Sequence, residues 1–384
     1  MQENKALAKT PGERSPGVWR PPLALYLHIP FCHARCGYCD FVTFTGKEDR
    51  IDAYILQLLK EAELYHERAG ERSIHTLFLG GGTPSILEPA QTHRLFEGLR
   101  HSFIVEPHAE VTLEANPESV TPEKAKAWRE AGINRISIGL QTMDDALLKR
   151  IERLHTAQEF KNAYATLRES GFSNLSIDLI YGLPGQTLAG WQDTLRATLA
   201  LKPEHLSLYA LAVEPHTPFA AAGIRTDSDE QAALYAWARE FLSNSGYPQY
   251  EISNFARPGC ECRHNLVYWR QQDYLGLGIG AVGCVDGRRW ENVKTLDAYE
   301  KLLAANARPR ATEEILDEKT RKFERLMLGL RLREGFVWGE ESDPAWSRER
   351  DRLAAEGLLE QIAGRWRIAE AAVPLTNQVL LPFV

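Results

Sequence analysis

The feature that most constrains the fold of this 384-residue chain is a repeated alternation of short apolar runs with amphipathic stretches. The apolar runs have the length of strands, and the stretches between them place apolar residues at a spacing near 3.6, as helices do. Six runs are predicted as strands, over residues 24–29, 76–80, 110–115, 135–140, 174–183 and 205–211. This alternation predicts an α/β fold with parallel strands and right-handed crossovers.

The position of the polar residues favours a barrel over an open doubly wound sheet, although six strand–helix repeats fit both. Unusual polar side chains stand at or just past the C-terminal ends of the first five predicted strands. Barrel enzymes carry their chemistry at that end of the strands. We therefore predict a partial (β/α)6 barrel of the TIM type.

The pattern divides the chain into four parts. Residues 1–22 mix charges with Pro and Gly and are predicted to form a flexible tail, and residues 23–246 form the predicted barrel core. Residues 247–304 are predicted to be a β-rich extension, with short strands and turns over 249–269 and 276–290. A helical stretch over 297–333 is expected to lead into a small, mixed, mostly helical C-terminal domain over 305–384.

Charge and hydropathy exclude several classes of partner. The 45 Lys and Arg residues against 52 Asp and Glu residues give a net charge of −7, which does not suit a protein that neutralises long stretches of nucleic acid. No run approaches the roughly 20 apolar residues of a transmembrane helix. The first 20 residues lack the apolar centre of a secretory signal. We expect a cytoplasmic protein, with peripheral contact to a membrane left open.

Three of the six cysteines stand close together in FCHARCGYCDF, at Cys32, Cys36 and Cys39. Thiolates are soft ligands that select zinc, copper(I) or iron–sulfur clusters. A structural zinc site needs four ligands, and no second C-x-x-C pair lies nearby. Three cysteines on one loop can instead hold three corners of a [4Fe–4S] cluster and leave one iron open. The alternatives are a zinc site completed by His33 and reduced structural thiols.

Further candidate residues follow the other predicted strands. The turn GGGTPS contains Gly81, Gly82 and Thr83, and glycines there let backbone groups approach a ligand closely. Glu114 closes the third predicted strand, Gln141 follows the fourth, and two further polar candidates are Arg153 in ERLH and Asp178 in SIDLIYGLP. A carboxylate such as Glu114 can accept hydrogen bonds from ribose hydroxyls. Each of these residues has a purely structural alternative.

The segment RHNLVYW places His264 before two aromatic residues, Tyr268 and Trp269. Imidazole is a common axial ligand of haem iron, and aromatic rings offer a flat apolar wall to a porphyrin. The alternative is a core histidine packed beside aromatic rings. Cys260 and Cys262 precede it and are more simply explained as stray thiols than as metal ligands. The segment GIGAVG fits a dinucleotide-binding pattern, but a turn follows it where a helix is required.

The cysteine loop after the first strand resembles the signature of the radical SAM superfamily. More narrowly, YLHIPFCHARCGYCDF resembles the branch that contains oxygen-independent coproporphyrinogen III oxidases and the HemW haem chaperones, from about residue 23 to the C-terminus. The resemblance implies a [4Fe–4S] cluster on the three cysteines, whose open iron chelates S-adenosylmethionine (SAM). It implies SAM contacts at Tyr26, Tyr38, Gly81, Gly82, Thr83, Glu114, Gln141, Arg153 and Asp178.

Three features place the resemblance closer to HemW than to the oxidases. Phe41 stands where the oxidases have a fourth cysteine, only 25 residues precede Tyr26, and H-N-x-x-Y-W is typical of HemW. The resemblance therefore implies a haem chaperone that uses a [4Fe–4S] cluster and SAM, binds haem through His264 and delivers haem to haem proteins. Its partners would be a haem-receiving protein and an electron donor such as flavodoxin or ferredoxin.

The alternative implied by the same resemblance is oxidative decarboxylation of coproporphyrinogen III. In that case a porphyrinogen would be the ligand, and the protein would be an oxidoreductase. Fold and cluster define the radical chemistry but not the substrate, so the sequence leaves open whether the chain is an enzyme.

Overall fold

One curved sheet organises the computed structural model, which describes residues 21–69, 72–339 and 344–383. Its order is β11-β10-β9-β8-β1-β2-β3-β4-β5-β6-β7. The strands are β1 (Leu23–Ile29), β2 (Ile74–Gly81), β3 (Val105–Ala115), β4 (Arg135–Gln141), β5 (Leu175–Tyr181), β6 (His205–Ala210), β7 (Asn254–Ala256), β8 (Tyr274–Leu277), β9 (Val282–Val285), β10 (Arg288–Asn292) and β11 (Arg310–Ile315).

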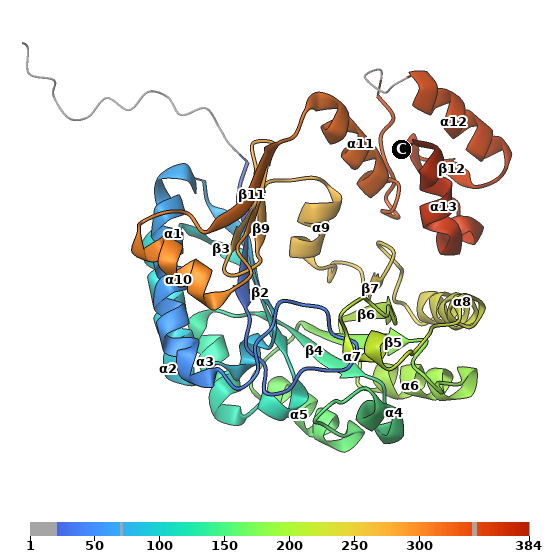
Figure 1. Cartoon of the computed structure of the whole chain (residues 1–384). Coiled ribbons are helices and arrows are strands. Elements are labelled where there is room, and N and C mark those ends of the chain that lie inside the picture. Colours follow the sequence, from blue (N-terminus) through green and yellow to red (C-terminus); the bar gives the residue numbers. More distant parts are fainter. Residues whose placement is uncertain (1–20, 70–71, 340–343, 384) are drawn as a thin grey trace, which may run out of the picture.

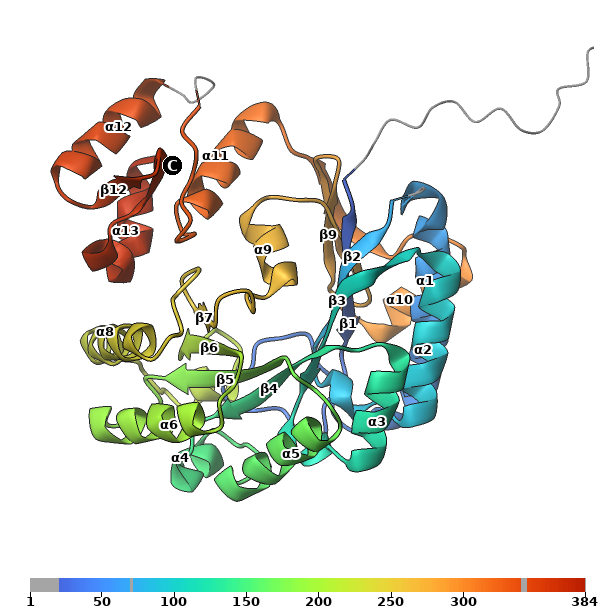
Figure 2. The same cartoon turned by 180° about the vertical axis from the view of Figure 1, so that it is seen from behind.

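The predicted partial barrel is confirmed. Strands β1 to β6 pair in parallel in chain order, and helices cover the convex outer face of the sheet (Figures 1 and 2). These helices are α1 (Ile51–Ala69), α2 (Pro89–Ser102), α3 (Pro122–Ala131), α4 (Asp145–Arg150), α5 (Ala157–Glu169), α6 (Leu188–Ala200) and α8 (Ser228–Asn244). Within the described residues the two edge strands, β7 and β11, do not pair with each other, so the barrel is open.

The residues predicted as a β-rich extension join the same sheet. Strand β7 pairs antiparallel with β6, while β8 lies parallel beside β1 and is followed by the antiparallel strands β9 and β10. The last glycine of GIGAVG, Gly283, lies within strand β9 and no helix starts there, which agrees with the rejection of a dinucleotide site. The proposed boundaries at residues 246 and 304 therefore do not divide the sheet, and they remain predictions.

The helical prediction over residues 297–333 is wrong in its middle. Helix α10 (Leu296–Ala304) and helix α11 (Glu318–Gly329) are separated by β11, which pairs with β10. Cross-strand ion pairs join Arg288 to Glu313 and Arg289 to Glu314. These pairs place opposite charges across the ladder, and such pairs stabilise a sheet.

The prediction of strands and turns over residues 249–269 holds for the short strand β7 but is wrong at its end, because helix α9 (Arg263–Trp269) lies there on the concave side of the sheet (Figures 1 and 2). Its first two backbone N–H groups, of Arg263 and His264, donate to the Glu110 carboxylate at 3.0 and 2.9 Å. A carboxylate at a helix N-terminus satisfies free donors and complements the helix dipole. Glu110 comes from β3, far away in the sequence.

The C-terminal part is mixed and mostly helical, as predicted. It contains α11, α12 (Pro344–Ala355), α13 (Thr376–Leu380) and the two-stranded sheet of β12 (Leu359–Ile362) and β13 (Arg365–Ile368). Of the predicted tail, residues 1–20 lie outside the described residues. No helix in the described part of the chain has the length and apolar character needed to cross a membrane.

Local sequence explains where several outer helices begin. Thr121, Thr156 and Thr187 each cap a helix by accepting a hydrogen bond from a backbone N–H in its first turn. Pro122 occupies the first position of α3, where no N–H partner is needed. Strand β4 is buried along its whole length, as expected for a parallel strand covered on both faces.

Glu61 of α1 fastens the extension to the barrel. Its buried carboxylate accepts hydrogen bonds from the Gly278 N–H at 2.8 Å, the Asn292 Nδ2 at 2.7 Å and the Tyr299 hydroxyl at 2.5 Å. Burial raises the pKa of Glu61 to about 7, although these three donors act in the opposite direction. The carboxylate therefore joins α1 to the Gly278 turn, to β10 and to α10.

We predict that Glu61→Leu lowers the free energy of unfolding by about 3 kcal/mol, because it leaves three buried donors without their acceptor. Denaturant unfolding monitored by circular dichroism measures the change. Glu63→Leu is the matched control, since Glu63 is exposed on the same helix, and its effect should stay within about 0.5 kcal/mol. Equal stability of the two variants would contradict the role given to Glu61.

Candidate functional site

A cavity of about 450 Å³ opens at the carboxyl ends of the parallel strands, a size typical of cofactor and ligand sites. Most of the residues selected from the sequence line it. They are Cys32, Cys36, Tyr38, Cys39, Gly81, Gly82, Thr83, Glu114, Gln141, Arg153 and Asp178. The strand ends thus bring together residues that are up to about 150 positions apart in the sequence.

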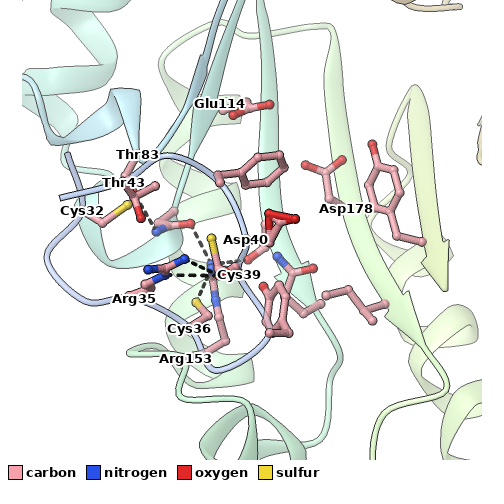
Figure 3. Close-up of a pocket in the computed structure, with 18 of the residues that line it drawn as sticks. Cys32, Arg35, Cys36, Cys39, Asp40, Thr43, Thr83, Glu114, Arg153 and Asp178 are labelled. Carbon is pink, nitrogen blue, oxygen red and sulfur yellow. Dashed lines mark hydrogen bonds between the residues drawn. The ribbon is translucent and has the colours of Figure 1, made fainter. Parts of the chain in front are cut away.

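The three candidate cysteines lie on one loop between β1 and α1. Backbone hydrogen bonds from the Cys32 N–H to the Phe44 carbonyl, at 3.0 Å, and from the Phe44 N–H to the Pro30 carbonyl, at 2.7 Å, close this loop at its base. Cys32 is buried, whereas Cys36 and Cys39 are half-buried. Figure 3 shows the three sulfur atoms around one region of the cavity.

Two of the thiols receive hydrogen bonds from neighbouring loops. The Thr83 hydroxyl donates to Cys32 Sγ at 3.2 Å, and Arg153 Nη1 donates to Cys36 Sγ at 3.7 Å. Burial raises the pKa of the Cys32 thiol to about 11 and also raises that of Cys39. A bound metal would offset this cost, since a positive metal centre favours the thiolate.

The zinc alternative is not supported by the position of His33. Its Nδ1 lies 3.8 Å from Glu48 Oε1, and its side chain is not part of the cavity wall. In the described part of the chain, no three His, Cys, Asp or Glu side chains converge so as to hold a single metal ion.

The glycine turn after β2 lies directly against the cysteine loop. The Gly82 N–H donates to the Ile29 carbonyl at 2.9 Å, and the Thr83 N–H donates to the Phe31 carbonyl at 2.8 Å. A Cβ atom on Gly82 would stand 2.8 Å from the Phe31 oxygen, so only glycine permits this approach. Gly81 has a φ of +109°, which also favours glycine.

The Glu114 side chain lines the cavity beside the glycine turn. Its Oε2 accepts a hydrogen bond from the Gly81 N–H at 3.1 Å. Burial, with a contribution from the nearby Asp178, raises the pKa of Glu114 to about 8. Asp178 accepts hydrogen bonds from the Ser137 hydroxyl at 3.0 and 2.9 Å, and burial raises its pKa as well.

Gln141 and Arg153 also line this cavity. The backbone of Gln141 has a φ of 69°, and the pairing of β4 with β5 is irregular between Gly139 and Gln141. Left-handed backbone at a non-glycine residue is uncommon and often marks a functional position. Arg153 Nη2 donates to the Gly139 carbonyl at 2.9 Å and to Asn116 Oδ1 at 2.8 Å.

Two predicted residues, Tyr26 and His264, lie instead in a second cavity of about 130 Å³ on the concave side of the sheet. This cavity shares Glu114 and Asp178 with the larger one. The hydroxyl of Tyr26 is hydrogen-bonded to His28 Nδ1 at 3.0 Å.

His264 is buried, and both of its ring nitrogens have partners. Nδ1 lies 2.9 Å from the Thr76 hydroxyl and Nε2 lies 2.8 Å from the Tyr268 hydroxyl. The ring stacks on Phe78, with 5.2 Å between the centroids. Burial lowers the pKa of His264 to about 3, so the ring is neutral at physiological pH.

Several cavity residues were not selected from the sequence. The side chains concerned include Asn116, Ser137, Tyr209, Arg35 and Asp40. Asn116 directly follows the end of β3, so the rule that selected Glu114 applied to it as well. Ser137 of β4 donates a hydrogen bond to Asp178 of β5, two positions beyond its partner Ser176, and the sequence did not predict this pairing. Phe41 also lines the cavity, and its side chain is 67% exposed.

Comparison with known proteins places this arrangement in a class and then in a family. The family model of the radical SAM superfamily matches residues 26–198. Curated relatives named heme chaperone HemW match nearly the whole chain. The protein of Lactococcus lactis is 37% identical over 89% of both chains, and that of Escherichia coli is 35% identical over 95% of this chain and 98% of its own. The chain belongs to the HemW family.

A solved structure shows the same fold. It is the structure titled coproporphyrinogen III oxidase (HemN) from Escherichia coli, a radical SAM enzyme, which superposes with a TM-score of 0.84. The superposition covers 94% of this chain and 90% of that chain at 24% identity. At this identity the likeness concerns the fold.

The superfamily implies a [4Fe–4S] cluster and SAM, and the residues of the larger cavity fit both. Three soft thiol ligands face it from one loop. A Cβ atom at Gly82 would collide with the cysteine loop, so the glycine turn leaves room for close contact there. The buried Thr43 hydroxyl lines the cavity and has no hydrogen-bond partner among the described residues.

We predict that the stability of the metal-free protein falls between about pH 5 and pH 8 partly because of Glu114. Its folded-state pKa of about 8 exceeds the unfolded value of 4.5, so the native state is favoured while the group is protonated and loses that advantage as it ionises. Glu114→Gln removes the ionisation and should melt a few degrees higher than the wild type at pH 8.

Thermal melts of the metal-free proteins at pH 5 and pH 8 measure this effect. The two proteins should differ little at pH 5, and the exposed Glu63→Gln control should follow the wild type at both values. If the melting temperature falls by the same amount from pH 5 to pH 8 in the wild type and in the Glu114→Gln variant, another group causes the loss of stability.

Proposed function

We propose that this protein is a haem chaperone that carries a [4Fe–4S] cluster on Cys32, Cys36 and Cys39 and binds SAM in the cavity of about 450 Å³. The observation that carries the proposal is the convergence of three thiols on one loop with the Gly81–Gly82 turn and Glu114. It occurs in a chain that aligns with heme chaperone HemW proteins over 89% or more of its length at 35–37% identity.

The residues of the chain have distinct parts in this proposal. The cluster, when bound, supplies one-electron chemistry to SAM. The backbone of the glycine turn and the Glu114 carboxyl offer hydrogen-bonding groups to the polar ends of SAM. Arg153 is half-buried, and burial disfavours its charge, yet the neighbouring Tyr38, Cys36 and Glu118 raise its pKa. It therefore stays cationic beside the thiols, where it can pair with a carboxylate.

The haem-receiving protein, the electron donor and the cytoplasmic location remain predictions from the sequence. The oxidase alternative has no observation of its own in the cavity, because the likeness to HemN concerns the fold. Anaerobic incubation with coproporphyrinogen III and with haem separates the two functions. Stable retention of haem without turnover is the result expected for the chaperone, and turnover without haem retention would establish the oxidase.

We predict that the anaerobically reconstituted protein contains about four irons and four sulfides per chain. Replacing Cys32, Cys36 or Cys39 with Ala should abolish the cluster, whereas replacing Cys260, Cys262 or Cys284 should preserve it. Iron and sulfide analysis measures both, and SAM should alter the electron paramagnetic resonance (EPR) spectrum of the reduced cluster. Iron loss in the second group of variants would show that the ligands are wrongly assigned.

His264 remains the proposed haem ligand, and the structure defines what its ligation requires. Nε2 is bonded to the Tyr268 hydroxyl, so iron can coordinate this atom only when that bond opens. We predict that Tyr268→Phe, which frees Nε2, binds haem at least as tightly as the wild type with a similar Soret band. His264→Ala should lose or shift the band.

Haem titration followed by absorption spectroscopy measures these effects, and iron content confirms that the cluster is intact in each variant. A Soret band in His264→Ala that matches the wild type in position and affinity would remove this residue from the haem site. The chaperone function itself is tested separately, by the anaerobic incubation with haem and with coproporphyrinogen III.

A further inference from the structure

We propose that Asn116 is a positioning residue that directs the hydrogen bond of Thr83 onto Cys32 and joins it to the hydrogen bond of Arg153 onto Cys36. One continuous chain of hydrogen bonds would then tune two of the three cluster ligands. This inference rests on the cluster of the proposed function but not on haem binding.

Four hydrogen bonds form the chain between the two thiols. Thr83 Oγ1 donates to Cys32 Sγ at 3.2 Å, and Asn116 Nδ2 lies 3.2 Å from Thr83 Oγ1. Asn116 Oδ1 accepts from Arg153 Nη2 at 2.8 Å, and Arg153 Nη1 donates to Cys36 Sγ at 3.7 Å. Figure 3 shows Thr83 and Arg153 reaching the cysteine loop from different parts of the fold.

The direction of every bond in the chain follows from the arginine. A guanidinium group can only donate, so the atom of Asn116 that faces Arg153 must be the carbonyl oxygen. The Asn116 NH2 group therefore faces Thr83 and donates to its hydroxyl oxygen. The Thr83 oxygen is then an acceptor toward Asn116, and its single proton is directed toward the Cys32 sulfur.

Asn116 and Arg153 each make a further hydrogen bond, and Thr83 is fixed by burial. The backbone N–H of Asn116 donates to the Ser85 hydroxyl at 3.1 Å, and Arg153 Nη2 also donates to the Gly139 carbonyl at 2.9 Å. Thr83 is buried, with 3% of its surface exposed. These contacts fix the side chains before any ligand arrives, and they come from the ends of β2, β3 and β4.

The expected consequence is a change in the reduction potential of the cluster. Hydrogen bonds to ligand sulfur atoms withdraw electron density and raise the reduction potential of an iron–sulfur centre. Among the described residues, the hydrogen bonds of the Asn116 side chain go to Thr83 and Arg153 and not to a sulfur atom. Its effect on the potential must therefore pass through Thr83 and Arg153.

Asn116→Asp tests the direction of the chain with little change of shape. The new carboxylate still accepts from Arg153, but it also accepts the Thr83 proton, which is then diverted from Cys32. We expect the midpoint potential of the cluster to become more negative and its EPR spectrum to change. Asn116→Leu, which has a similar shape but no hydrogen-bonding groups, should shift the potential in the same direction without adding a charge.

A double-mutant cycle separates the lost hydrogen bond from the added charge. In the Thr83→Val background the bond to Cys32 is already absent, so Asn116→Asp should shift the potential less there than in the wild type. Thr83→Ser keeps the hydroxyl and should restore the full effect of Asn116→Asp. The exposed Asn162→Leu variant is the matched control and should leave the potential unchanged.

Anaerobic potentiometric titration monitored by EPR measures all of these potentials. Equal shifts from Asn116→Asp in the wild-type and Thr83→Val backgrounds would overturn the inference, as would an unchanged potential in Asn116→Leu with full iron content. Failure of the wild type itself to hold a cluster would overturn the proposed function instead. The iron analysis of the wild type therefore distinguishes the two failures.

Discussion

The close backbone approach between the glycine turn and the cysteine loop is the contact on which the site depends. Strands β1 and β2 are neighbouring parallel strands, so the segments that follow them leave the sheet at the same edge. Two backbone hydrogen bonds, to the carbonyls of Ile29 and Phe31, then join these segments. A side chain on Gly82 would separate them, and Thr83 would no longer reach Cys32. The two loops can therefore stay in contact because residue 82 is a glycine and has no Cβ atom.

The electrostatics of the cavity follow from its position at the mouth of a partly closed barrel. Burial makes the ionised forms of Glu114 and Asp178 costly, and it favours neutral Cys32 and Cys39 thiols. Arg153 keeps its positive charge there. Burial thus opposes negative charge on the thiols, and a bound metal centre would favour their thiolate forms. The cavity therefore has the character expected of a site completed by a cofactor.

The smaller cavity contains the proposed haem ligand His264. Helix α9 lies on the concave side of the sheet and brings His264 into the smaller cavity. Glu114 and Asp178 line both this cavity and the larger one. The histidine is neutral and bonded at both nitrogens. Any ligand that coordinates it must compete with Tyr268 or Thr76. Under the proposed function, haem ligation by His264 would therefore require one of these two hydrogen bonds to open.

The sequence by itself determined the α/β alternation, the six parallel strands and eleven of the residues that line the larger cavity. It did so because hydrophobic periodicity is local and because parallel strands place their carboxyl ends at one edge, which selected Glu114 and Gln141. Helix α9 and strand β11 were decided only by the tertiary structure, through Glu110 at one helix end and through pairing with β10. Asn116 and Ser137 gained their roles only through partners on other strands. These contacts join residues distant in the chain, so no local pattern records them.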